Sequence, residues 1–247
     1  MKTVVAAFLL LGAIAGVVQS VAAESGAVLG TVKISGEAPP AKLLHPKGDH
    51  AVCGSESRPS EALVVSASRG VKNAVVFIGH ERLEGWRSTT TFQIDQRRCT
   101  FVPHVLIIPP GSTVEILNSD GILHNFHTAS RLNPPMNLGQ PGKAKPLRVT
   151  FERPEVVQVK CDVHGEGFMR AWIVVAAHPY YALTDDEGRF RLAGVPPGPH
   201  TLEVWHEVLG TRRVPVTVGA SGEVTVTVTF KSVAPNLQRG GRHGLAH

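Results

Sequence analysis

The chain has 247 residues and a formal net charge of +5, one unit of which belongs to Lys2. This length is enough for one large β domain or two small ones. The positive charge is moderate and is not gathered into a dense Lys/Arg block with interleaved aromatic residues, which argues against nucleic-acid binding. The 25 glycines and 18 prolines are typical of a turn-rich all-β protein.

The N-terminus, MKTVVAAFLLLGAIAGVVQSVAAES, predicts a signal peptide over residues 1–23. One lysine precedes an apolar run, and the small residues 21–23 form a cleavage site. An uncleaved anchor would need about 20 apolar residues without the Gln19-Ser20 break. No later stretch is long and apolar enough to span a bilayer. We therefore expect a periplasmic or secreted protein with no membrane span after cleavage.

Short β-branched or alternating runs recur along the chain, whereas helical periodicity is nearly absent. The first set of predicted strands lies at 27–35, 73–79, 104–109, 112–118, 146–151, 155–161 and 170–176. The second set lies at 188–194, 200–207, 212–218 and 222–230. Residues 36–70 and 119–145 read as loops, and the tail at 233–247 has too little apolar surface to fold, so we expect it to be disordered.

These runs predict an all-β protein with two units. A β-sandwich with an N-terminal extension would occupy residues 24–177, and a smaller β-sandwich would occupy 178–232. The connection between them is short and starts with apolar residues, so we expect the units to pack rigidly. Segment 25–80 could instead complete the second sandwich, and the sequence leaves this alternative open.

Three cysteines remain after signal cleavage: Cys53, Cys99 and Cys161. In an oxidising compartment an odd number indicates one disulfide and one thiol with another role. Cys53 and Cys99 lie in loop-like contexts, so we predict that they pair. Cys161 lies in KCDVHGEGFM beside His164 and Met169, which are soft-metal ligand types.

A further histidine, His124, follows the turn at 118–121 in ILNSDGILHNFHT. NSDGILHN, followed about forty residues later by CDVHGEGFM, resembles the cupredoxin family of small blue copper proteins. The Cys-x2-His-x4-Met spacing is similar to that of plastocyanin and pseudoazurin. The resemblance implies one type 1 copper ion with His124, Cys161 and His164 as equatorial ligands and Met169 as the weak axial ligand. Asn125 would tie the two ligand loops together.

The resemblance covers residues 100–176 and implies a Greek-key cupredoxin-like sandwich. YYALTDDEGRFRLAGVPPGPHTLEVWHE resembles a carboxypeptidase-regulatory-like β-sandwich, a module that usually carries no catalysis. The whole chain is similar to exported bacterial proteins labelled methylamine-utilisation proteins. The cupredoxin resemblance implies a non-enzymatic carrier of single electrons between redox partners, such as a c-type cytochrome or a periplasmic dehydrogenase. Electrons would leave through the solvent-facing edge of His164, inside an apolar docking patch made of Gly121, Ile122, Leu123, Gly165 and Phe168.

Several other residues have competing interpretations. His127 lies three residues after His124 on a strand, which points it to the opposite face. We interpret His104 as a strand histidine, while Met136 packs nearby or competes as axial ligand. His206 and Glu207 are adjacent on a strand and therefore face opposite ways, which disfavours a metal pair.

Alternative functions are a non-redox copper-delivery protein and a β-sandwich binding module. A structural zinc site would have more thiolates and no methionine. The chain contains no Gly-x-Ser-x-Gly, no His-Glu-x-x-His and no phosphate-binding loop, so an enzyme is disfavoured.

Overall fold

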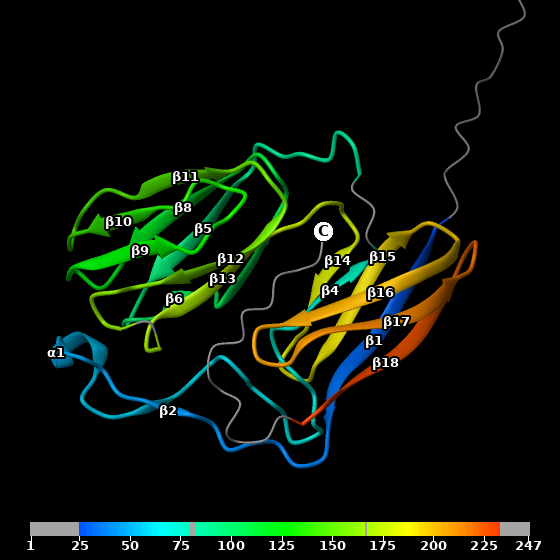
Figure 1. The fold of residues 1–247 in the computed structure, drawn as a ribbon, viewed down its shortest axis with the longest axis horizontal. Helices are drawn as coiled ribbons and strands as arrows, with labels where there is room; N and C mark the ends of the chain where they lie inside the picture. Colours follow the sequence, from blue (N-terminus) through cyan, green and yellow to red (C-terminus); the bar gives the residue numbers. More distant parts are fainter. Residues whose placement is uncertain (1–24, 80–82, 166, 233–247) are drawn as a thin grey trace, which may run out of the picture.

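The computed structural model describes residues 25–79, 83–165 and 167–232. The expected signal peptide and the expected disordered tail lie outside these ranges. Within them the chain forms strands and one short helix, α1 (His50–Cys53). The predicted all-β class with two sandwiches is confirmed, and the sandwiches lie side by side (Figure 1). No helix in the described ranges is long and apolar enough to cross a membrane.

The first sandwich packs a five-stranded sheet against a four-stranded sheet. The five-stranded sheet has the order β10 (Asn137–Gln140), β9 (His124–Thr128), β12 (Glu155–Lys160), β13 (Arg170–Val175), β7 (Val105–Ile108). The four-stranded sheet has the order β11 (Leu147–Phe151), β8 (Ser112–Asn118), β5 (Thr91–Gln96), β6 (Phe101–Val102). Phe101, Phe126 and Phe151 are fully buried between the two sheets.

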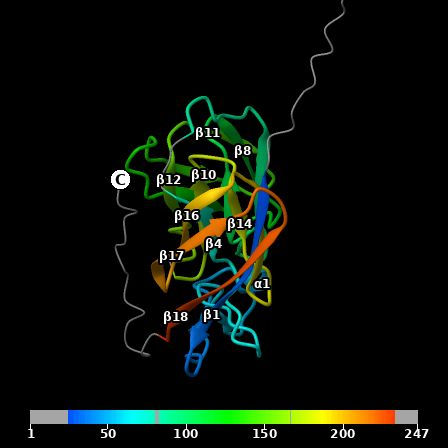
Figure 2. The same cartoon turned by 90° about the vertical axis from the view of Figure 1, so that its right-hand side faces the viewer.

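The second sandwich has a three-stranded and a four-stranded sheet, and Figure 2 shows it from its own side. The three-stranded sheet has the order β15 (Arg189–Val195), β1 (Gly26–Ser35), β18 (Glu223–Lys231). The four-stranded sheet has the order β14 (Tyr181–Leu183), β4 (Val75–Ile78), β16 (Gly198–His206), β17 (Gly210–Val218). A separate small ladder joins β2 (Leu43–Leu44) to β3 (Arg58–Pro59).

Strands from both ends of the chain build this second sandwich. β1 runs parallel to β18 from the pair Ala27–Glu223 to the pair Ser35–Lys231, and β4 is antiparallel to β16. The pairing therefore differs from the expected division into 24–177 and 178–232, and it matches the alternative in which segment 25–80 completes the second sandwich. Pairing between strands this far apart in sequence depends on shape and burial in the folded chain, which no local pattern encodes.

The contact between the sandwiches explains three continuous apolar runs, in β13, β7 and β4. Successive side chains of a strand point to opposite faces. In β13, Ala171 and Ile173 pack into the first core, while Trp172 and Val174 pack against the second sandwich. β7 divides in the same way, and β4 packs one face into the second core and the other against the first sandwich, so both faces of these strands are apolar. At the centre of the contact, the rings of Trp172 and Trp205 meet edge to face at 5.1 Å.

Two strands of the first sandwich lie where the sequence suggested a loop. Residues 119–145 contain β9 and β10, which pair from Asn137–His127 to Gln140–His124. β5 was not predicted either, although its sequence TFQIDQ alternates polar residues with Phe92 and Ile94. β9 is buried at four of its five residues and mixes histidine with Asn and Phe, so it lacks the alternation that identifies a half-buried strand.

Candidate metal centre

The predicted ligands gather at one end of the first sandwich. His124 opens β9, Cys161 directly follows β12, and His164 lies in the connection from β12 to β13. β9 and β12 are antiparallel neighbours, with Lys160 opposite His127. The start of β9 and the end of β12 therefore lie at the same edge, although 37 residues separate His124 from Cys161.

Three donor atoms form a compact, fully buried triangle. The Nδ1 atoms of His124 and His164 are 3.0 Å apart, and the Cys161 Sγ lies 3.9 and 3.8 Å from them, respectively. None of the three residues is exposed to solvent. A point equidistant from three atoms so placed lies about 2.1 Å from each, close to usual metal–nitrogen and metal–sulfur bond lengths of about 2.0–2.3 Å.

The outer nitrogens of both imidazoles are bound to carboxylates. His124 Nε2 donates to Asp120 Oδ2 at 2.9 Å, and His164 Nε2 donates to Asp49 Oδ2 at 2.9 Å. A neutral imidazole with its proton on Nε2 presents a lone pair at Nδ1. Both inner lone pairs and the sulfur then face one another at contact distance. This arrangement suits a bound cation, and burial favours the neutral form of His124 by lowering its pKa against the hydrogen bond to Asp120.

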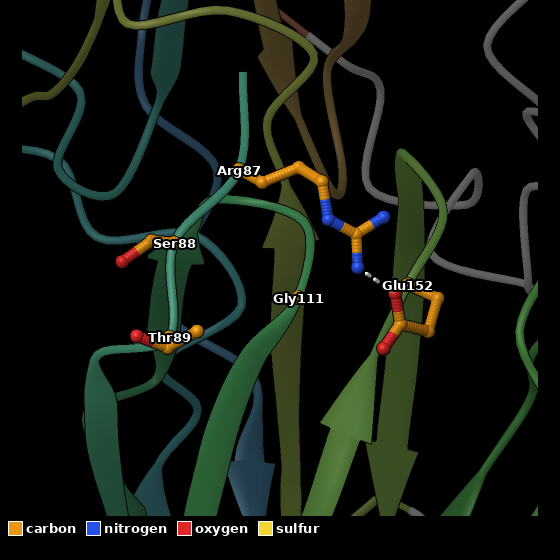
Figure 3. A pocket seen from close by; sticks show the side chains of 5 residues that line it. All are labelled: Arg87, Ser88, Thr89, Gly111 and Glu152. Carbon is orange, nitrogen blue, oxygen red and sulfur yellow. Dashed lines mark hydrogen bonds and ion pairs between the residues drawn. The ribbon is translucent and has the colours of Figure 1, made fainter. Parts of the chain in front are cut away.

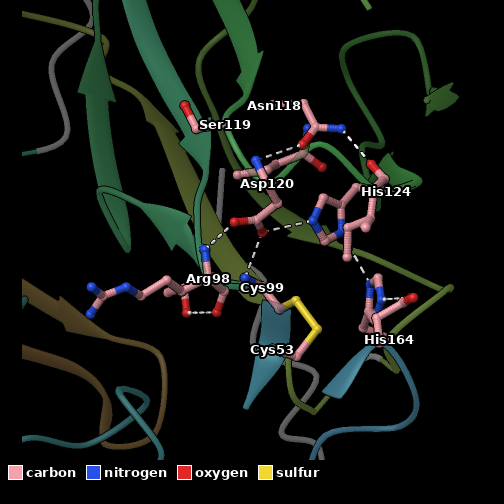
Figure 4. Close-up of polar contacts among 12 residues, drawn as sticks. Cys53, Arg98, Cys99, Asn118, Ser119, Asp120, His124 and His164 are labelled. Atoms are coloured by element: carbon pink, nitrogen blue, oxygen red, sulfur yellow. Dashed lines mark hydrogen bonds and ion pairs between the residues drawn. A yellow bond between two sulfur atoms is a disulfide. The ribbon is translucent and has the colours of Figure 1, made fainter. Parts of the chain in front are cut away.

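Asp120 is held by a backbone turn that presents two N–H groups to it. Arg98 and Cys99 are the two central residues of the turn between β5 and β6, and both have positive φ values, 51° and 52°. Arg98 N–H donates to Asp120 Oδ1, and Cys99 N–H donates to Asp120 Oδ2 at 2.7 Å (Figure 4). Consecutive N–H groups in this conformation form an anion-binding concavity. The turn therefore orients the carboxylate that in turn orients His124.

Asn125 joins the two ligand-bearing segments, as the cupredoxin resemblance implied. Its Oδ1 accepts the Asp162 backbone N–H at 2.7 Å, and its Nδ2 donates to Asp162 Oδ2 at 3.1 Å. Its backbone N–H points at the Cys161 Sγ at 3.5 Å. Such a donor to the sulfur tunes a metal that the sulfur binds. The position immediately after His124 therefore supports both loops.

The segment from Cys161 to Met169 folds back on itself. Cys161 N–H donates to Met169 C=O at 3.1 Å, and Met169 N–H donates to Gly165 C=O at 3.2 Å. Met169 is fully buried in the first core, which also contains Cys161. The chain thus returns the methionine to the sheet edge that carries the cysteine.

The prediction that the ring edge of His164 faces solvent as the electron exit is wrong. His164 is fully buried, and its outer nitrogen is bound to Asp49. The predicted docking patch is also only partly at the surface. Leu123 is 49% exposed, but Phe168 is only 7% exposed, and the guanidinium of Arg58 lies 3.9 Å from the centre of its ring. Gly121 is exposed, and Ile122 and Gly165 are half-buried. No local sequence pattern predicts these contacts, because Asp49 lies 115 residues from His164 and Arg58 lies 110 residues from Phe168.

The rival residues lie outside the donor triangle. His127 is partly exposed, and its Nδ1 donates to Asp162 Oδ2 at 2.6 Å. His104 is hydrogen-bonded to Glu207 across the contact between the sandwiches. Met136 is half-buried against the first core. His206 is buried, and its Nδ1 accepts the backbone N–H of Val208 at 3.2 Å.

The predicted disulfide is confirmed and lies beside the same histidines. Cys53 is bonded to Cys99, and Cys161 is the free cysteine of the described residues. The two disulfide sulfurs and a ring nitrogen of His164 lie within 4.8 Å of one another (Figure 4). The disulfide therefore lies beside His164, the same histidine that the Cys161 sulfur faces.

A shallow depression lies at the other end of β8 from the donor triangle. It is lined by Arg87, Ser88, Thr89, Gly111 and Glu152, and an ion pair between Arg87 and Glu152 spans it (Figure 3). Both charged side chains are more than half exposed. Its polar groups do not converge on a buried centre, so the donor triangle is the stronger candidate site.

Residues 157–231 match the family described as carboxypeptidase regulatory-like domain. The match covers less than a third of the chain, and it begins within β12 of the first sandwich. No curated protein matches the chain.

Solved structures similar to the chain include copper proteins. The Cu-containing nitrite reductase of Thermus scotoductus SA-01 is 27% identical over 40% of this chain and 24% of its own length, with a TM-score of 0.31. The chain thus spans about a quarter of that protein. A pseudoazurin from Methylobacterium extorquens AM1 is 21% identical over 35% of this chain and 75% of its own (TM-score 0.29). A purple cupredoxin from Nitrosopumilus maritimus is 21% identical over 34% and 98% (TM-score 0.29).

Similarities at these TM-scores carry no argument about function, which has to come from the donor set itself. What the chain shows is an all-β architecture of two sandwiches, a carboxypeptidase-regulatory-like segment and cupredoxins among the similar solved structures.

Proposed function

We propose that this is an exported type 1 copper protein that carries single electrons between redox partners. The observation that supports it is the buried triangle of two imidazole nitrogens and one cysteine sulfur, with side lengths of 3.0, 3.8 and 3.9 Å. Two histidines and a cysteine with a weak axial methionine form the donor set typical of blue copper electron-transfer sites. The disulfide supports an oxidising compartment, periplasmic or secreted.

In this proposal His124, Cys161 and His164 would hold the metal, and Met169 would supply a thioether ligand. Bound copper would supply a one-electron couple. The protein would contribute rigidity, because Asp120, Asp49 and Asn125 fix the imidazoles and the cysteine before the metal arrives. Small reorganisation between oxidation states follows from a rigid, dry site. Full burial of all three donors favours a carrier over a copper-delivery protein, which has to release its ion readily.

Partner contact would use the exposed side of the ligand loops. Leu123 and Val163 immediately precede the two ligand histidines, and they are 49% and 41% exposed. Small apolar surfaces suit transient redox encounters with a c-type cytochrome or a periplasmic dehydrogenase.

The test is to load the purified protein with Cu(II) and to record its visible and paramagnetic resonance spectra. We expect a strong absorption band at about 600 nm and narrow copper hyperfine splitting. Cys161→Ser should abolish the band, whereas the control His200→Gln, at a half-buried histidine of the second sandwich, should keep it. A colourless wild-type protein, or an ordinary tetragonal copper signal, would contradict the proposal.

A further inference from the structure

The segment from Lys47 to Arg58 covers the His164 side of the donor triangle, and we call it the cover. It belongs to the extension between β1 and β4, includes α1, and crosses to the end of the first sandwich (Figure 1). It contacts the ligand loop at several points. The aliphatic part of Lys47 lies beside Gly165, where a Cβ would come within 3.4 Å of the lysine Cδ.

Asp49 is the residue of the cover that contacts a residue of the donor triangle, His164. It immediately precedes α1, a position where aspartate usually accepts a hydrogen bond from the first turn of the helix. Here its side chain makes no such bond, and its φ of 45° lies in the left-handed region. The carboxylate instead accepts the His164 Nε2 proton at 2.9 Å. The side chain of Asp49 is 47% exposed while that of His164 is 0% exposed, so the carboxylate is the boundary between the imidazole and water.

The cover is fastened at two points that follow Asp49 in the chain. Cys53 at the end of α1 is bonded to Cys99 in the β5–β6 turn. The guanidinium of Arg58 donates to the carbonyls of Arg98, at 2.7 Å, and Phe168, at 3.1 Å. It also stacks on the Phe168 ring, which is a favourable cation–π geometry. One covalent bond and one multidentate arginine therefore fix a segment that has little regular structure of its own.

The turn that receives the disulfide is the same one that orients Asp120. Cys99 is bonded through its sulfur to Cys53, and its backbone N–H donates to Asp120, which also accepts from His124. The disulfide therefore joins the segment that carries Asp49 to the turn that holds Asp120. Asp49 and Asp120 are the carboxylates that orient the two imidazoles.

From these contacts we propose that Asp49 is a positioning residue for His164, held in place by the disulfide-fastened cover. This inference rests on the proposed function for the identity of its metal, but it concerns the His164 imidazole in both the metal-free and the copper-loaded protein. Asp49 keeps the proton of His164 on Nε2 and its Nδ1 directed at Cys161 and His124. The cover also keeps chelators and water away from the ring of His164. Electrons therefore do not enter or leave through a solvent-exposed His164 ring.

The test compares Asp49→Ala and Asp49→Asn with Glu152→Gln. The control removes a charge from the exposed Arg87–Glu152 pair at the opposite end of the sandwich. The first readout needs no copper: ¹⁵N NMR of the metal-free protein reports which nitrogen of His164 carries the proton. We expect an Nε2-protonated ring in the wild type and in Glu152→Gln, and a mixture of tautomers in Asp49→Ala. Asp49→Asn, whose amide oxygen still accepts a hydrogen bond, should retain the wild-type tautomer.

The second readout is the rate at which EDTA removes Cu(II) from the loaded protein. Loss of an outer hydrogen-bond partner commonly weakens metal binding about 10–100-fold. We expect Asp49→Ala to lose copper at least about tenfold faster than Glu152→Gln. The double variant Cys53→Ser/Cys99→Ser should behave like Asp49→Ala in both readouts, because the cover is then unfastened.

An Asp49→Ala protein that matches Glu152→Gln in tautomer and in copper loss would overturn the inference. A double cysteine variant that matches the wild type would overturn the role of the disulfide. If the wild type takes up no copper in a type 1 site, the proposed function fails by itself. The tautomer of His164 in the metal-free variants then still decides whether Asp49 positions it.

Discussion

Asn125 and Asp162 exchange two hydrogen bonds that tie the beginning of β9 to the segment after β12. The amide oxygen accepts the Asp162 N–H at 2.7 Å, and the amide nitrogen donates to the carboxylate at 3.1 Å. Asp162 also accepts from His127 at 2.6 Å. The His127 bond is the main cause that lowers the pKa of Asp162 to about 2, and the Lys160 and Asn125 bonds assist it. The carboxylate therefore stays ionised and available as an acceptor across the neutral range.

Replacement of Asn125 by Leu should loosen this connection. The Asp162 N–H loses its acceptor, and an unsatisfied group of this kind costs about 1–3 kcal/mol. Urea unfolding of the metal-free protein measures the loss. The control is Gln93→Ala, which removes an exposed hydrogen bond to Glu115 and should stay within about 0.5 kcal/mol of the wild type. Equal free energies of unfolding for the two variants would contradict the structural role of Asn125.

The disulfide predicts a defined count of thiols. Titration of the denatured, metal-free mature protein should find one thiol, that of Cys161, and three after reduction. Because Cys53 and Cys99 are 46 residues apart, their removal as Cys53→Ser/Cys99→Ser should lower the free energy of unfolding by about 2–4 kcal/mol. Finding three thiols without reduction would disprove the pairing.

The buried pair between the sandwiches should matter far more than a surface pair. Glu207 is 4% exposed in its side chain and is hydrogen-bonded to His104. Burial opposes its ionisation, but the His104 hydrogen bond and charge outweigh burial and lower the pKa of Glu207. Glu207→Ala leaves His104 without its partner and should cost about 3–5 kcal/mol.

Fluorescence of Trp172 and Trp205, whose rings meet at this contact, reports the unfolding of the Glu207 variant. Glu223→Gln is the matched control, because it breaks an ion pair with Arg191 in which both side chains are about half exposed. Exposed pairs contribute about 0–1 kcal/mol. A Glu207 variant as stable as the Glu223 variant would show that the two sandwiches do not depend on this pair.

His206 should make the protein sensitive to acid. Burial lowers its pKa to about 4, against the opposing charge of Glu207. Below about pH 6.5, the ordinary pKa of a histidine, His206 binds a proton in the unfolded chain but not in the folded chain. Stability is therefore fully present above about pH 6.5 and falls as the pH decreases to about 4, by about 3 kcal/mol from this residue.

The measurement is the free energy of unfolding at several pH values in this window, for the wild type and for His206→Gln. The difference between the two proteins isolates this histidine from the carboxylates that also titrate in acid. The slope should be smaller in the variant. Identical slopes would mean that His206 is protonated in the folded protein.

Local sequence determined the chemistry of the donor set and the fold class. Strand alternation repeats every two residues, and the spacing Cys161-x2-His164-x4-Met169 lies within one loop, so both are visible without a structure. The pairing of Cys53 with Cys99 followed from cysteine count and from the ligand-like neighbours of Cys161. Each of these conclusions depends on residues that are close in the chain or few in number.

The tertiary structure alone decided which strands share a sheet and what covers the site. β1 pairs with β18 across almost two hundred residues, and Asp49 reaches His164 across 115. Such contacts depend on how whole sheets pack and on loop closure, whose free-energy cost grows only slowly with loop length. No local sequence pattern therefore predicts them. An exposed-looking aspartate before a short helix and a histidine beside a cysteine become partners only when the fold places their segments at the same edge.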